Sequence, residues 1–363
     1  MRKTLILHIG HFKTGTTALQ VFCATNQPAL RKQGIDYTGH GLHHSKHSRP
    51  AFALYRAAGV STLMHGYRNP TPPEQVWAEL FEAVLASNSP RVLVSSEEFM
   101  RLGAHPAAEA RLAQIIAPLR DRIDFQVIAY LRPPQSHLTS WYNQLVKMNI
   151  PVPGFNEALG TVIEPVHYDY ALALGPWLRL FGPEAVTIRP YSAALRGTTA
   201  LFEDFLKTLG ITGPFSARRW ALPAQDVNAR LDDETVEIHR IANALQLPKD
   251  QRDWLLNRLK RLGASLTPGT ETPARPIDEI AAACEAGLVA LEGLPHNGLS
   301  LDAMRADLPR PVDPQRLDPS LLIALLVSET HLLRSAQWQK TAEQNARIKA
   351  LEERIEQLGA QRK

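Results

Sequence analysis

A short segment near the amino terminus has the residue types of an anion-binding loop. His8–Thr17 reads His-Ile-Gly-His-Phe-Lys-Thr-Gly-Thr-Thr and follows a short apolar run. Backbone N–H groups at the start of a helix are unpaired, and the helix dipole adds partial positive charge there. Lys13 would add a full charge, Gly15 would let the backbone approach closely, and Thr16 and Thr17 would donate from their hydroxyls. These residues predict a loop that binds a phosphate or phosphosulfate group.

The order of residues in this loop narrows the anion. In the nucleoside-triphosphate loop G-x-x-x-x-G-K-[ST] the lysine follows the second glycine, whereas here Lys13 precedes Gly15. No predicted strand ends directly in the acidic residue expected to help hold Mg²⁺, since the candidate ends read Ser95-Ser96-Glu97 and Leu131-Arg132. The dinucleotide motif G-x-G-x-x-G is also absent. The sequence therefore disfavours a Mg-nucleotide kinase and a dinucleotide oxidoreductase.

The elements that must position this loop alternate between strand and helix. Apolar runs predict strands at Thr4–Ile9, Val92–Val94, Phe125–Leu131 and Ala185–Arg189. Helical spacing predicts helices at Thr16–Asn26, Glu74–Ala86, Ala107–Leu119, Pro133 to about Met148, and Thr199–Leu209, with a loop at Gly39–Pro50. This alternation predicts an α/β fold, a P-loop-like parallel sheet flanked by helices. Ligands gather at the carboxyl ends of such strands, and Lys13, Glu97 and Arg132 each follow one.

The first loop resembles the 5′-phosphosulfate loop of bacterial sulfotransferases that use 3′-phosphoadenosine 5′-phosphosulfate (PAPS). A second family motif, an arginine after a central strand and a serine eight residues later, is matched by Arg132 and Ser140. Pro133-Pro134 departs from the polar residues expected after that arginine. The resemblance extends over about residues 4–215 and implies a PAPS-dependent enzyme that requires no metal.

The resemblance also implies roles for individual residues. Lys13 would assist catalysis, and Arg132 with Ser140 would bind the 3′-phosphate. Tyr191 either contacts the adenine or packs in the core. The loop residues that would hold the 5′ end of the donor are Lys13, Thr14, Gly15, Thr16 and Thr17.

The general base has several candidates. Glu97 follows the predicted strand 92–94 in a Ser-Ser-Glu arrangement, and it could instead pair with Arg101. Glu98 is expected to point away, because alternate strand residues face opposite sides. Three histidines in the loop after the first helix are rivals, since imidazole titrates near neutrality; they are His43, His44 and His47.

The chain beyond about residue 215 changes character. Long helical patterns cover Leu231–Leu245 and Asp250–Leu262, and prolines mark connectors at Thr267–Pro276 and Leu308–Pro319. We expect a sulfotransferase domain over residues 1–215, a helical extension over 216–335 and a charged terminal helix over 336–363. In the terminal helix an a/d-like spacing would suit either a short coiled coil, and so a homodimer, or packing on its own domain; it is formed by Ile348, Leu351, Ile355 and Leu358.

Composition sets outer limits on the function. The chain has 363 residues, 44% of them hydrophobic, and a formal net charge of +4 from 40 basic and 36 acidic residues. This balance is not that of a dedicated nucleic-acid binder. Cys23 and Cys284 form no C-x-x-C motif, and no apolar stretch approaches the ~20 residues of a membrane span. We therefore expect a cytoplasmic protein with reduced thiols.

Two other functions stay open at this level. One is a kinase-like, Mg-nucleotide-dependent phosphotransferase, and the other is a non-catalytic adaptor with a nucleotide-binding fold and an active terminal helix. The acceptor is a hydroxyl or an amine, and a carbohydrate or glycoconjugate is suggested by family analogy alone.

Overall fold

The computed structural model describes most of the chain. The described residues are 2–61, 63, 67–196, 199–223, 276–312 and 319–360, with single positions between 236 and 253. The helical patterns predicted at Leu231–Leu245 and Asp250–Leu262 and the connector Thr267–Pro276 lie outside the described residues, apart from those single positions and Pro276.

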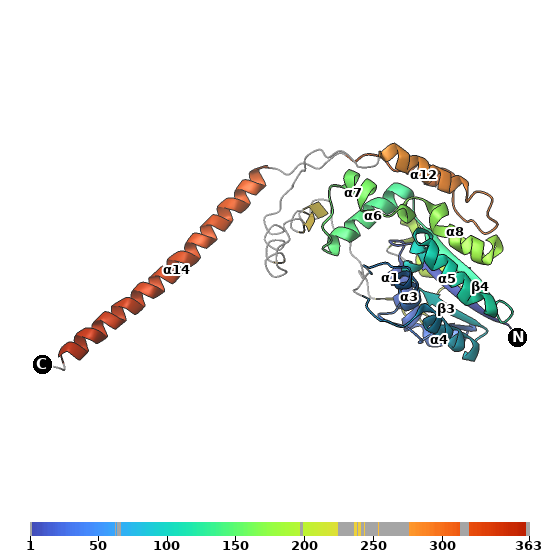
Figure 1. Cartoon of the computed structure of the whole chain (residues 1–363), viewed down its shortest axis with the longest axis horizontal. Helices are drawn as coiled ribbons and strands as arrows, with labels where there is room; N and C mark the ends of the chain where they lie inside the picture. The colour runs from blue at the N-terminus through green and yellow to red at the C-terminus, as the bar shows by residue number, and fades with distance from the viewer. Residues whose placement is uncertain are drawn as a thin grey trace. The chain divides into compact units, whose positions relative to one another are not determined.

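A five-stranded sheet forms the centre of the fold, with strand order β2-β3-β1-β4-β5 and every pair parallel (Figure 1). The strands are β1 (Lys3–Gly10), β2 (Ile35–Tyr37), β3 (Arg91–Ser95), β4 (Ile123–Leu131) and β5 (Val186–Pro190). The predicted fold class is confirmed: a P-loop-like parallel sheet flanked by helices, with helices at the carboxyl-terminal end of the chain.

Helices cover both faces of the sheet. The α-helices before β4 are α1 (Thr16–Thr25), α2 (Gln27–Arg31), α3 (Arg49–Ala57), α4 (Pro73–Ala86) and α5 (Pro106–Ile116). Those after β4 are α6 (Pro134–Lys147), α7 (Phe155–Thr161), α8 (Tyr170–Phe181), α9 (Ala200–Thr208), α12 (Ile277–Val289), α13 (Leu301–Arg305) and α14 (Pro319–Ala360). Short 3₁₀ helices connect them: η2 (Glu97–Ala104), η3 (Ala117–Leu119), η4 (Pro165–His167), η5 (Pro183–Ala185) and η6 (Ala193–Leu195).

The alternation of side chains along β1 divides the core into two clusters. Leu5, Leu7 and Ile9 pack on one face with residues of α3, α4, α5, α8 and α12. Ile6 packs on the other face with residues of α1 and α9. Because strand residues alternate between faces, a continuous apolar run such as Leu5–Leu7 can serve both clusters at once. The sheet is therefore buried on both sides.

Some elements were not predicted from the sequence. Strand β2 has only three residues, and α8 contains Gly175 and Pro176, which weaken a helical pattern. The chain also turns into η2 at Glu97, so Glu98 belongs to a 3₁₀ helix rather than to a strand end. The predicted loop ends as α3 begins at Arg49.

The chain divides into two compact units. One comprises residues 1–145, 153–230 and 271–312, and the other comprises 146–152, 231–270 and 313–363. In the first unit, α12 packs against α7, α8 and α13. The domain boundaries drawn from the sequence stay a prediction. Among the described residues, no helix combines the length and the apolar character needed to cross a membrane.

Candidate functional site

The loop between β1 and α1 lies at the point where the sheet changes its winding direction. Strand β1 has β3 on one side and β4 on the other, and the chain reaches the first through β2 and the second directly after β3. In open α/β sheets the carboxyl edge beside such a switch point is the usual ligand position. The loop that follows β1 is therefore placed where a ligand is expected.

Gly15 gives the loop its tight approach to neighbouring segments. Its φ of 77° is in the left-handed region, and it caps the start of α1. A Cβ at this position would lie 2.5 Å from Leu201 Cδ2 and 3.1 Å from Tyr191 Cε2. Only glycine fits both the backbone conformation and the space. Tyr191 is thereby brought directly against the loop.

Two loop threonines use their hydroxyl protons inside the loop. Thr14 Oγ1 donates to the His11 carbonyl at 2.6 Å, and Thr16 Oγ1 donates to the same oxygen at 2.9 Å. A hydroxyl has one proton to donate, so in this state neither can donate to an anion as well. Both threonines hold the loop in shape. Thr17, at half-buried depth, makes no such bond among the described residues.

Lys13 connects the loop to helix α6. Its Nζ donates to Gln144 Oε1 at 3.0 Å across 131 positions of sequence. Ser140 lies one turn before Gln144 on the same helix, so the two share a face. The bond therefore turns the Ser140 face of α6 toward the loop.

Arg132 and Tyr191 lie close to this same edge. Tyr170 Oη donates to the Arg132 carbonyl at 2.7 Å, and the Tyr191 N–H donates to the Leu131 carbonyl at 2.7 Å. Burial raises the pKa of the Tyr191 phenol, while the positive charges of Arg196 and Arg132 oppose that shift. The guanidinium of Arg132 thus acts on the ring that touches Gly15.

Glu97 lies beside the loop at the end of β3. Its Cα is 3.1 Å from the position that a Cβ on Gly10 would occupy. Gln20 Nε2 donates to Glu97 Oε2 at 2.8 Å, and Lys46 Nζ pairs with Glu97 Oε1 at 3.3 Å. The carboxylate pairs with Lys46 rather than with Arg101, which binds Glu164 instead. Each carboxylate oxygen has two lone pairs, so Glu97 can still accept a proton or a further hydrogen bond.

Glu98 has a different environment from its neighbour. Its side chain is fully buried, and neither carboxyl oxygen has a hydrogen-bond partner among the described residues. Burial, reinforced by the charge of Glu97, raises the pKa of Glu98 to about 8. Glu98 is therefore a neutral acid at pH 7 whose side chain is buried in the protein, and it belongs to η2, so the strand alternation used in the sequence analysis does not apply to it.

The three rival histidines separate into two kinds. His43 and His44 lie on a turn with their ring centroids 4.1 Å apart, and His44 is exposed. His47 is buried: its Nε2 lies 2.9 Å from the Thr38 carbonyl, and its Nδ1 accepts from the Ser95 N–H. Burial lowers the pKa of His47 to about 4. With both nitrogens bonded, His47 braces the loop against β3.

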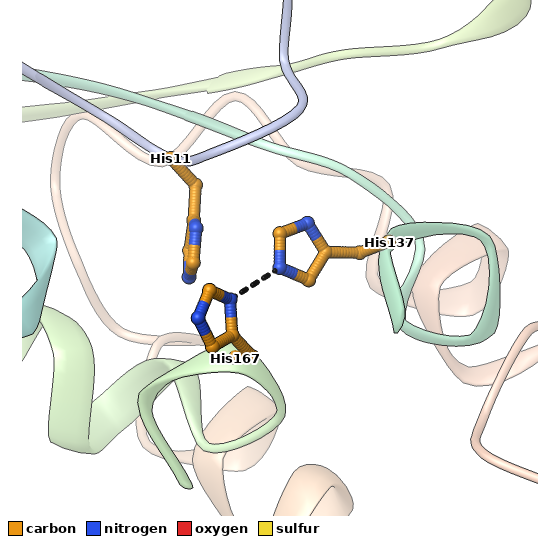
Figure 2. A group of neighbouring side chains, drawn as sticks. All are labelled: His11, His137 and His167. Carbon is orange, nitrogen blue, oxygen red and sulfur yellow. Dashed lines mark hydrogen bonds between the residues drawn. The ribbon is translucent and has the colours of Figure 1, made fainter. Parts of the chain in front are cut away.

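Three further histidines gather beneath the loop from distant parts of the chain: His11 after β1, His137 on α6 and His167 on η4 (Figure 2). The Phe12 N–H donates to His11 Nδ1 at 2.7 Å, so His11 Nε2 carries the proton that the Val166 carbonyl accepts at 2.9 Å. His137 Nε2 and His167 Nδ1 share a hydrogen bond of 3.1 Å. This histidine cluster ties the loop to α6 and η4.

The histidine cluster has the residue type of a metal site, with one nitrogen of each ring within 4.8 Å of the others. Its chemistry favours a neutral cluster instead. His11 has no lone pair left after its two hydrogen bonds, and the positive charges of Arg132 and Lys13 help to lower the pKa of His137 after the larger effect of burial. A divalent cation would meet these charges and would require His11 to give up one of its two hydrogen bonds.

Sequence reasoning missed several residues of the site. Gln20 stands one helical turn after Thr16, a spacing that could have suggested it, whereas nothing in the sequence pointed to Lys46 as a partner of Glu97. Gln144 stands one helical turn after Ser140, a spacing that could have suggested it. The histidine cluster had no sequence signal, because its members are joined only by tertiary contacts.

Comparisons with known proteins add a distant similarity among solved structures. No protein-family model matches the sequence, and no curated protein matches it. Among solved structures, the chain is similar to the crystal structure of a sulfotransferase from Alicyclobacillus acidocaldarius, with a TM-score of 0.47 and 18% sequence identity. The similarity covers 84% of this chain and 100% of that one.

Proposed function

We propose that this chain is a sulfotransferase that moves a sulfuryl group from PAPS to a hydroxyl or amine acceptor, with a carbohydrate as the acceptor class. The observation that carries the proposal is the hydrogen bond from Lys13 to Gln144. It joins the loop motif to the helix that follows Arg132, and the resemblance assigns these two motifs to opposite ends of one donor.

The residues at this edge suit a donor with two anionic ends. The loop N–H groups, the start of α1 and Lys13 supply positive charge for the 5′ end. Arg132 supplies a planar fork of donors for the 3′-phosphate, and Ser140 lies on the face of α6 turned toward the loop. Tyr191, which is packed against Gly15, offers a ring beside the adenosine.

The chemistry needs charge stabilisation and a proton acceptor. Bound PAPS supplies the sulfuryl group and leaves as 3′,5′-ADP. Lys13 Nζ provides a positive charge where negative charge grows on the leaving oxygen. Glu97 accepts the proton of the acceptor hydroxyl or amine, held in position by Gln20 and Lys46.

Calorimetry with 3′,5′-ADP tests the donor. We expect 3′,5′-ADP to bind without Mg²⁺ and at least tenfold more tightly than ATP, because Arg132 and Ser140 recognise a phosphate that ATP lacks. Arg132→Ala would remove most of that preference, and Arg31→Ala, an exposed arginine on α2, serves as the matched control. Mg²⁺-dependent ATP binding with no 3′,5′-ADP binding would instead identify a kinase-like phosphotransferase and overturn the proposal.

An acceptor screen with labelled PAPS tests the reaction. Glycans, lipids and small alcohols are offered in parallel, and transfer to glycans alone is the expected outcome. Loss of transfer in Lys13→Ala would separate an enzyme from an adaptor, whose function would survive that change and be lost on removal of residues 341–363.

A further inference from the structure

The start of helix α6 is capped by a residue from a distant part of the chain. The Gln135 N–H donates to the Asp307 carbonyl at 2.7 Å, and the Ser136 N–H donates to Asp307 Oδ2 at 2.9 Å. Pro134 has no N–H, and the His137 N–H donates to the carbonyl four residues before it. Every N–H group of the first turn of α6 therefore has a partner, and Asp307 accepts two of them.

The segment that follows Asp307 is also bonded to α6 and α7. The Arg310 N–H donates to Gln135 Oε1 at 3.1 Å. Val312 and the Asn156 side chain exchange two hydrogen bonds of 3.0 Å each. The cap is therefore one contact of a segment that lies along both helices, which holds the carboxylate of Asp307 at the start of α6.

The capped end of α6 is the end that follows Arg132. Arg132 stands two residues before Pro134, and its carbonyl accepts from Tyr170 Oη at 2.7 Å. Burial raises the pKa of the Tyr170 phenol, the positive charge of Arg132 opposes that shift, and the negative charge of Asp307 adds to it. The charges of Arg132 and Asp307 therefore act on one buried group at this end of the helix.

The occupied N–H groups limit how this end of α6 can hold a phosphate. The backbone of residues 134–137 has no donor left for an anion, so side chains must bind it. The fork of Arg132 and the hydroxyl of Ser140 bind most tightly when the helix that carries them is already in place. Asp307 fixes the start of that helix.

We propose that Asp307 is a positioning residue for the donor: its cap on α6 holds Arg132 and Ser140 where they bind the 3′-phosphate. The inference rests on the proposed function, because it uses the donor assigned there. Asp307 acts through the start of α6 and not by contact with the donor. It lies beyond residues 4–215, so the resemblance to sulfotransferases assigns it no role.

Calorimetry with 3′,5′-ADP and with 5′-AMP measures this role, because the two ligands differ only in the 3′-phosphate. We expect Asp307→Ala to lower the preference for 3′,5′-ADP by about fivefold, the scale of losing a helix cap, with 5′-AMP binding unchanged. Asp307→Asn keeps an oxygen that accepts from Ser136 and should restore most of the preference. Asp302→Ala removes an exposed carboxylate of α13 and, as the matched control, should leave the preference unchanged.

The Arg132→Ala background tests whether Asp307 acts through this end of α6. There, Asp307→Ala should cause no further loss of preference, since the group that it positions is gone. Equal loss of both ligands in Asp307→Ala, or an unchanged preference, contradicts the positioning role while the proposed function stands. An unaltered chain that binds 3′,5′-ADP no more tightly than 5′-AMP contradicts the proposed function and this inference with it.

Discussion

Two groups of titratable side chains flank the same loop, and they are held in opposite ways. On the β3 side, Glu97 is bonded to Gln20 and Lys46 and keeps a small exposed fraction of 13%. On the α6 side, the histidine cluster is buried and hydrogen-bonded within itself and to the backbone. The difference teaches that residue type alone does not identify a reactive group. Burial makes the imidazoles part of the scaffold, even though His137 Nδ1 has no hydrogen-bond partner among the described residues, whereas its partial exposure leaves the Glu97 carboxylate able to exchange a proton.

Among the changes that test this comparison, removal of the loop lysine should have the largest effect on activity. Lys13→Met takes away the one full positive charge of the loop, and kcat/KM for sulfuryl transfer should fall about 10³-fold, the scale of losing a donor to a developing anion. The melting temperature should change little, because Lys13 is only half-buried. Lys32→Met, on an exposed residue after α2, is the control and should keep full activity.

The neighbouring glutamates provide a matched pair for the proton acceptor. Glu97→Gln should lower kcat by about 10²–10³-fold without weakening 3′,5′-ADP binding, since it removes the base and leaves the donor site intact. Glu98→Gln should keep near-normal kcat at pH 7, because Glu98 is already neutral there. Equal losses of kcat in both variants, measured in the same transfer assay, would show that Glu97 is not the base.

Acidification should lower the free energy of unfolding through the histidine cluster, because its imidazoles are buried. Burial lowers the pKa of His11 to about 4 and that of His137 and His167 well below the usual value of 6.5. A lowered folded pKa means that the unfolded chain binds more protons below pH 6.5. Stability is therefore full above 6.5 and falls on acidification, by about 1 kcal/mol per pH unit for each such histidine.

Denaturant unfolding at several pH values measures this slope. His137→Leu should make the loss of stability between pH 6.5 and 5 shallower, whereas His44→Leu, on an exposed residue, should leave it unchanged. A slope that does not respond to His137→Leu would mean that this imidazole is accessible to protons in the folded chain.

Glu98 should give a pH dependence of stability with the opposite sign, because burial raises its pKa. Its folded pKa of about 8 lies above the unfolded value of 4.5, so its stabilising contribution is full below 4.5 and is lost as pH rises through 8. Glu98→Gln removes this titration. The variant should gain on the order of 4 kcal/mol over the unaltered chain between pH 5 and pH 9 in urea unfolding. A constant difference across that range would contradict a buried neutral Glu98.

The prediction of the fold succeeded where the apolar pattern was continuous. Strands β1, β3, β4 and β5 were located within a few residues, because each is a run of apolar residues that ends at a polar or glycine residue. Strand β2 and helix α8 were missed for local reasons: one is too short to show a period, and the other contains a glycine and a proline. Strand β2 is stabilised by packing against β3, and α8 is stabilised by packing against η2.

The candidate site was predicted in part for a related reason. Lys13, Glu97 and Arg132 could be named because parallel strands bring their carboxyl ends to one edge, whatever the details of packing, whereas Ser140 was named from the family resemblance alone. Their partners could not be named, since Gln144 and Lys46 reach the site from elements whose orientation depends on the assembled core.

The sequence by itself determined the order of strands and helices, the loop with lysine before glycine, and the heptad spacing of the terminal helix. These features depend on local periodicity and on short motifs, which do not require contacts between distant parts of the chain. The tertiary structure alone decided which ionisable groups are accessible. It buried Glu98 beside a Glu97 that keeps a small exposed fraction, and it brought three histidines together in a neutral cluster. Protonation depends on desolvation and on neighbouring charges, and both are set only when the core has formed.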